Sequence, residues 1–99
     1  MTEPAWDRLL DLLERFASNP NLPLSDDVER TFAALCTQAI EEGSVDRELH
    51  LPDTARWLTG LVAAHRVVRQ AHPEVPPDDD VAVLRIIVTR WLHPARLNR

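Results

Sequence analysis

Hydrophobic positions recur along this chain every three to four residues, through most of its length. Residues at that spacing share one face of an α-helix, so the pattern predicts amphipathic helices rather than strands. Short polar or proline-containing connections separate the predicted helices, which span residues 3–17, 26–42, 52–71 and 79–92. We therefore expect an all-α fold of four helices, forming a single domain over residues 1–99.

The first two predicted helices show an ordinary one-sided pattern with recognisable ends. Thr2 is a plausible cap, and Pro4 suits a first turn because that position needs no N–H. Ser25 or Asp26 caps the second helix, and Gly43 follows it where a left-handed backbone commonly ends a helix. The predicted buried residues are Trp6, Leu9, Leu10, Leu13, Phe16 and Ala17, then Val28, Phe32, Leu35, Cys36, Ala39 and Ile40.

The last predicted helix departs from this pattern, because its apolar residues spread around too much of its circumference. At about 100° per residue they fill a continuous sector of roughly half the circumference, and Ile86 lies outside that sector. A surface helix normally keeps a narrower stripe toward its core. We therefore expect residues 81–92, introduced by the aspartates 78–80, to pack on a second body as well as on their own domain.

The third predicted helix is the longest, and it carries a histidine within its apolar side. Its apolar residues are Ala55, Trp57, Leu58, Leu61, Val62, Ala64 and Val68. An imidazole among them needs a hydrogen-bond partner. Three interpretations of His65 therefore stay open: a satisfied core or interface residue, a polar contact to a bound ligand, or a catalytic group.

Composition and charge restrict the partners of the chain. Its 99 residues are 44% hydrophobic and 27% charged, with a formal net charge of −5 and no lysine. Residues 1–53 hold 12 acidic and 4 basic groups (net −8), and residues 54–99 hold 4 and 7 (net +3). Nucleic-acid binding needs concentrated positive charge, so we expect none by this chain.

Cysteine usage and hydropathy indicate the cellular compartment. The single cysteine excludes an internal disulfide, which fits a reducing cytoplasm. No uninterrupted apolar run approaches the roughly 18 residues of a membrane span, and no basic region precedes a long apolar core near the N-terminus. We therefore predict a cytoplasmic protein without membrane association.

The candidates for chemistry each have a simpler structural explanation. His65 and His72 are about 10 Å apart along a helix, too far to share one metal ion, and neither has a carboxylate at i+3 or i+4. Cys36 has no neighbouring histidine in sequence and lies on an apolar face, as a core residue would. The aspartates 78–80 suit the start of a helix as capping groups. We expect no metal, no cofactor and no enzymatic activity.

Several short motifs occur in a recognisable order in the second part of the chain. The first are Glu41-Glu42-Gly43-Ser44-Val45 and Leu51-Pro52-Asp53-Thr54-Ala55-Arg56-Trp57-Leu58-Thr59-Gly60-Leu61. They are followed by Pro76-Pro77-Asp78-Asp79-Asp80 and Trp91-Leu92-His93-Pro94. In this order and spacing, over roughly residues 28–94, they resemble the C-terminal regulatory domain of TetR-family transcriptional repressors.

That resemblance implies both an interface and a pocket. In such proteins the last two long helices pair with their copies across a two-fold axis, and the preceding helices enclose a small-molecule pocket. The resemblance therefore implies a homodimer, with Gly60 allowing close helix approach. The implied interface residues are Leu58, Val62, Leu84, Ile87, Val88 and Trp91. Trp57, Leu61 and His65 are the residues expected to face a small apolar or aromatic ligand.

The helix-turn-helix that precedes this domain in the family has no counterpart here. We therefore expect either a fragment of a longer DNA-binding regulator, beginning at an added methionine, or a free-standing regulatory domain. The leading hypothesis is a non-catalytic ligand-sensing and dimerisation domain. The alternative is a dimerisation module that binds no small molecule, and an enzyme ranks third.

Overall fold

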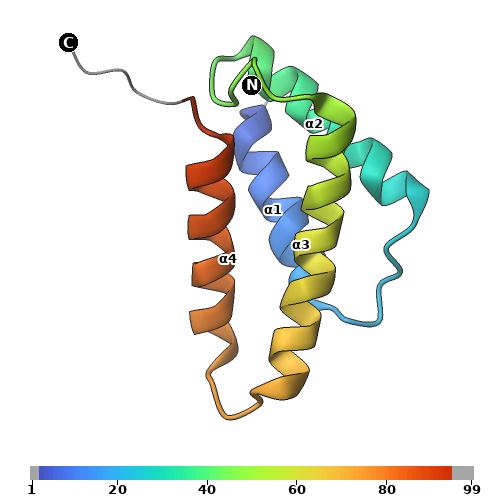
Figure 1. The fold of residues 1–99 in the computed structure, drawn as a ribbon, viewed down its shortest axis with the longest axis vertical. Coiled ribbons are helices and arrows are strands. Elements are labelled where there is room, and N and C mark those ends of the chain that lie inside the picture. Colours follow the sequence, from blue (N-terminus) through green and yellow to red (C-terminus); the bar gives the residue numbers. More distant parts are fainter. Residues whose placement is uncertain (1–2, 95–99) are drawn as a thin grey trace, which may run out of the picture.

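The computed structural model describes residues 3–94, which form α-helices and, within that range, no strand (Figure 1). The elements are α1 (Ala5–Ser18), α2 (Asp26–Glu41), α3 (Leu51–Ala71) and α4 (Pro77–Leu92). The all-α, four-helix prediction is confirmed for this part of the chain, with every boundary within two residues of its predicted place. The predicted cap Thr2 lies outside the described residues.

The helices form a central pair and two flanking helices. α1 and α3 pack on each other, and each of them also contacts both α2 and α4. α2 and α4 make no contact with each other in the described part of the chain, because they lie on different sides of the central pair (Figure 1). None of the helices in residues 3–94 has the length and apolar character needed to cross a membrane.

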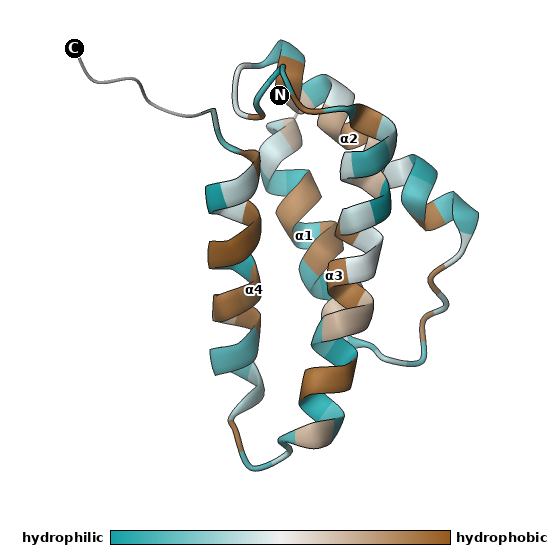
Figure 2. Cartoon of the chain, in the orientation of Figure 1, coloured by the Kyte–Doolittle hydropathy of each residue, from teal (hydrophilic) through white to brown (hydrophobic). Residues whose placement is uncertain are grey.

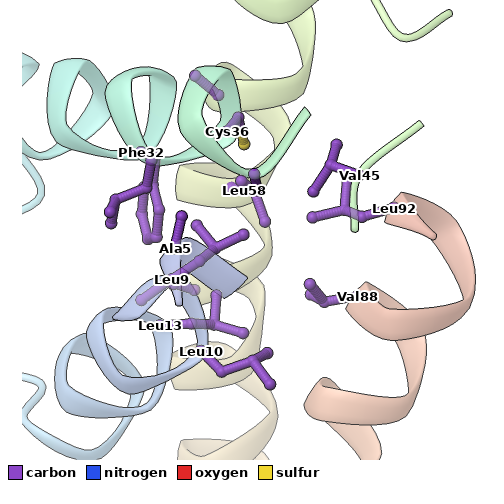
Figure 3. Packing of buried hydrophobic residues seen from close by; sticks show 14 of the residues in the cluster. Ala5, Leu9, Leu10, Leu13, Phe32, Cys36, Val45, Leu58, Val88 and Leu92 are labelled. Atoms are coloured by element: carbon purple, nitrogen blue, oxygen red, sulfur yellow. The ribbon is translucent and has the colours of Figure 1, made fainter. Parts of the chain in front are cut away.

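A single hydrophobic cluster joins all four helices and the α2–α3 connection. Figure 3 shows Phe32 of α2 beside α1, with Val88 and Leu92 of α4 on another side of the core. The largest fully buried side chains are Phe32, Leu9, Leu13, Leu58 and Leu92. Burying one such side chain contributes about 1.5–3 kcal/mol, so these residues hold the four helices together.

The end of α2 is fixed by a glycine and by a contact to α1. Gly43 has φ of 86°, as predicted for the residue after a helix, and Ser44 N–H donates back to Ala39 O at 2.9 Å. The Glu42 carboxylate accepts a hydrogen bond from Ala5 N–H at 2.9 Å. An acceptor from α2 therefore satisfies one of the free N–H groups at the start of α1.

Candidate functional site

The candidate site begins with a face of α3 that the core does not use. The buried residues of α3 include Leu58, Val62 and His65. The residues of the neighbouring face recur at helical spacing within about 60° of one another: Trp57, Leu61, Ala64 and Val68. Trp57 is 57% exposed and Val67, close to this face, is 65% exposed. α3 therefore presents apolar surface in two directions.

Besides the core residues Leu84 and Val88 in its middle, α4 makes polar contacts to the rest of the fold near its two ends. At its start, the Asp80 carboxylate accepts a hydrogen bond from Arg69 of α3 at 2.7 Å. At its end, Leu92 O accepts from Asp46 N–H at 2.7 Å, and the His93 ring lies 4.3 Å, centroid to centroid, from that of Trp6. Between these two attachments, α3 and α4 leave a groove.

The groove is apolar and small. Its volume is about 130 Å³, well below the several hundred Å³ of a typical small-molecule pocket. α3 contributes Leu61, Ala64, His65 and Val68 to its lining, and α4 contributes Asp80, Val83, Leu84 and Ile87. A cavity of roughly this size accommodates one aromatic ring or one branched aliphatic side chain.

The outward face of α4 continues this apolar surface. Residues at i, i+4, i+7 and i+11 form a stripe opposite the core: Asp79, Val83, Ile86 and Arg90. Val83 and Ile86 are about half exposed, and Ile87 beside the stripe is 46% exposed. Apolar side chains on α4 thus face solvent as well as the core.

His65 lies at the base of the groove, where its ring is buried but not hydrogen-bonded. The residue is 7% exposed, and neither ring nitrogen has a partner at good hydrogen-bond geometry, although a backbone contact at Ala17 favours the protonated ring. Burial lowers the pKa of His65, which the nearby Asp80 carboxylate partly opposes. The imidazole is therefore neutral at pH 7, and it carries the cost of an unsatisfied buried polar group.

A second, more polar hollow lies on the other side of His65. Its volume is about 290 Å³, and it is bordered by the end of α1, by α3 and by the start of α4. Arg66 and Arg69 both line it, but each is already engaged. Arg66 donates to Phe16 O at 2.8 Å and to Asn19 O at 3.1 Å, and Arg69 pairs with Asp80. This hollow therefore has little free hydrogen-bonding capacity.

The three residues expected to face a ligand are only partly brought together. Leu61 and His65 line the groove, whereas Trp57 borders neither hollow. Both spaces are open at the surface rather than enclosed. Leu61 and His65 therefore share one hollow, and Trp57 lies outside both of these hollows.

The expected dimer residues separate into two groups according to their burial in the single chain. Leu58, Val62, Leu84 and Val88 lie in the core of one chain, each at most 4% exposed. Their surface is already covered by neighbouring helices, so they have almost none to offer a partner. Ile87 and the half-buried Trp91 remain available at the surface.

The sequence-based assignment also missed exposed apolar residues that now define the surface. They are Val67, Val68, Val83 and Ile86. The available signal was the spacing on each helix, since Val68 lies four residues after Ala64 and Ile86 three residues after Val83, beside the core-facing stripes. Hydrophobicity alone did not separate the two faces, because both are apolar.

The remaining chemical candidates have structural roles. Burial raises the pKa of Cys36 to about 11, so its thiol is protonated and unreactive. In residues 3–94 no group of three or more histidine, cysteine, aspartate or glutamate side chains is arranged to hold a metal ion. The aspartates 78–80 lie inside the first turn of α4, and the N-cap is Pro76 without a side-chain hydrogen bond. Their predicted role as hydrogen-bonding caps is therefore wrong, although their charges still favour the helix N-terminus.

Comparison of the chain with protein-family models, curated proteins and solved structures gave no match. The resemblance to TetR-type regulatory domains consequently rests on the motifs in the sequence. The proposed function below rests on the geometry of the α3–α4 surface.

Proposed function

We propose that this chain is a non-catalytic dimerisation domain of a regulatory protein, which associates with a second copy through α3 and α4. One observation carries the proposal. Among the described residues, every large hydrophobic side chain that is strongly exposed belongs to α3 or α4: Trp57, Val67, Val68, Val83, Ile86 and Ile87. Contiguous exposed apolar patches on soluble proteins commonly mark interaction sites.

The charges on this surface favour a second copy as the partner. The exposed stripe of α4 begins with Asp79 and ends with Arg90, with apolar residues between them. Two copies related by a two-fold axis can match the acidic end of one stripe with the basic end of the other. The surface is therefore complementary to itself in charge as well as apolar. A TetR-like regulatory role agrees with such a dimer, and it remains part of the proposal.

The experiment that tests the dimer is sedimentation or light scattering at micromolar concentration, with Ile87→Asp as the disrupting variant. The wild-type protein should have a mass in solution twice that of a single chain. Ile87→Asp should be monomeric and still folded, because the side chain is exposed in one chain and a dimer would bury an unpaired charge. Ala34→Asp places the same charge on the exposed surface of α2 and should leave the dimer intact. A wild-type chain that is monomeric and soluble at all concentrations would refute the proposal.

Ligand sensing is a second candidate, favoured by the unsatisfied His65 between the two hollows. A small apolar or aromatic molecule with one polar group would occupy the larger hollow and reorient the ring toward itself. Thermal shift with benzoate, indole and short-chain fatty acids tests it. A ligand present at 100 times its dissociation constant adds about 2.7 kcal/mol of stability. A wild-type shift that is lost in His65→Leu would support this candidate, and the absence of such a shift would remove it.

A further inference from the structure

The exposed stripe of α4 has an acidic end, an apolar middle and a basic end. Asp79, Val83, Ile86 and Arg90 lie within about 60° of one another around the helix. Within residues 3–94, Asp79 and Arg90 form no ion pair. Their neighbours differ in this respect, since Asp80 pairs with Arg69 and Arg85 pairs with Glu14. The two unpaired charges on the stripe are thus opposite in sign.

The separation of these charges selects one orientation of two paired α4 helices. Asp79 and Arg90 are 11 positions apart, or roughly 16 Å along the helix. Parallel copies in register would place Asp79 against Asp79 and Arg90 against Arg90. Antiparallel copies place each Asp79 against the Arg90 of the other copy, which gives two favourable pairs and a two-fold axis level with Leu84 and Arg85.

The same register also aligns the apolar residues. With Asp79 opposite Arg90, Val83 of each copy lies opposite Ile86 of the other. The axis then passes at the level of Leu84, which lines the α3–α4 groove. Ile87, which lines the same groove and is 46% exposed, then lies within one turn of the axis on each copy.

We propose that two copies of this chain dock with their α4 helices antiparallel, in a register set by reciprocal Asp79–Arg90 ion pairs that flank the apolar contact. This inference rests on the dimer proposed above and specifies its geometry. The apolar residues supply most of the burial, while the ion pairs at the rim fix orientation and register. An amphipathic helix from an unrelated protein would not require opposite charges at matched distances from the centre of the stripe.

The experiment is a reciprocal charge swap, measured by native mass spectrometry and sedimentation at low salt, with a mass tag on one variant. In Asp79→Arg alone, the substituted side chain would meet Arg90 of the other copy at both contacts. In Arg90→Asp alone, the substituted side chain would meet Asp79 of the other copy at both contacts. Each variant should therefore dimerise roughly tenfold more weakly than wild type, since two exposed pairs together contribute about that factor. When the two variants are mixed, each contact of the heterodimer joins an arginine to an aspartate, so the heterodimer should form in preference to either homodimer.

The preference follows from counting the contacts in the mixed dimer. One contact joins Arg90 of the first variant to Asp79 of the second, as in wild type, and the other joins the two substituted side chains, which are also opposite in charge. Asp79→Arg combined with Arg90→Asp in one chain restores two attractive contacts in its homodimer, which should recover wild-type affinity. A mixture of this double variant with the wild-type chain places like charges at both contacts, so the two homodimers should form in preference to the heterodimer.

Asp78→Arg is the matched control. It makes the same charge change in the same first turn of α4, but it lies about 100° around the helix from Asp79 and off the stripe. It should leave the dimer dissociation constant within about twofold of wild type. A larger effect of Asp79→Arg would then be due to the register of the ion pairs, because both variants change the net charge and the charge at the helix N-terminus equally. If wild type is dimeric but the double variant fails to recover the affinity lost in the single variants, the register is refuted and the dimer stands. If wild type is monomeric, the proposed function itself fails.

Discussion

α2 and α4 are helices of equal length, 16 residues each, that pack on the same central pair. α2 buries its apolar stripe, including Phe32 and Cys36, and exposes mainly polar side chains. α4 buries Leu84, Val88 and Leu92, yet it also exposes Val83, Ile86 and Ile87. Figure 2 shows that the middle of α4 is hydrophobic. Folding of the single chain therefore buries most apolar side chains of α2, but it leaves several large ones on α4 exposed.

The difference between α2 and α4 distinguishes apolar surface that stabilises the single chain from apolar surface that is left for a partner. A helix with one apolar stripe loses its exposed hydrophobic surface when the single chain folds. A helix with a second stripe retains surface that only another body can cover. All four helices contribute to the core, whereas the strongly exposed large hydrophobic side chains of the described residues belong only to α3 and α4, where the proposed association surface lies.

The largest expected effect comes from breaking the core on the α2 side. Phe32→Ala removes a fully buried ring and should lower the free energy of unfolding by about 3–5 kcal/mol at any protein concentration. Ile87→Ala on α4 removes a side chain that is 46% exposed. Its effect should be small below the dimer dissociation constant and larger above it. Urea unfolding at two protein concentrations measures both, and equal losses for Ile87→Ala at the two concentrations would contradict the contrast.

An intermediate effect is expected at His65, where the α3–α4 side carries a polar group that is not hydrogen-bonded. His65→Leu removes a buried imidazole without partners and should stabilise the chain by about 1–3 kcal/mol at pH 7. The pKa of His65 is lowered in the folded chain, chiefly by burial; Asp80 and the backbone of Ala17 oppose the shift, and Arg69 and Arg66 add to it. The unfolded chain therefore binds the proton more readily than the folded one.

The pH dependence follows from that sign. Stability from a neutral His65 is fully present above its unfolded pKa of about 6.5 and is lost as the pH falls below that value. Chemical denaturation between pH 8 and pH 5 should show this loss in wild type, and a smaller loss in His65→Leu. Identical pH profiles would show that His65 does not titrate with unfolding.

The smallest effects are expected at the two glycines, Gly60 within α3 and Gly43 just after α2. A Cβ at Gly60, on the exposed side of α3, would meet nothing within 4 Å. Gly60→Ala should therefore stabilise the chain by about 0.5–1 kcal/mol. Gly43 ends α2 at φ of 86°, so Gly43→Ala should destabilise by about 1 kcal/mol. The melting temperatures of the two variants test these two predictions. A loss of stability in Gly60→Ala below the dimer dissociation constant would mean that a contact within the chain needs this glycine.

Several features of this protein follow from the sequence by itself, because they depend on interactions between nearby residues. The four helices, the break at Gly43 and the proline-containing connections are of this kind. The sequence also indicated that residues 81–92 are more apolar than a single core requires. The exposed Val83, Ile86 and Ile87 agree with that expectation.

Only the tertiary structure decided which apolar residues face inward. Leu58, Val62, Leu84 and Val88 were expected at an interface but lie in the core. The rotation of α3 and α4 about their axes is set by the packing of α3 on α1 and α2, by the packing of α4 on α1 and α3, and by the Arg69–Asp80 and Asp46–Leu92 contacts. These contacts join residues far apart in sequence, so periodicity along one helix cannot determine them. That rotation turns Ile86 and Val67 outward, and so creates the surface on which the proposed dimer depends.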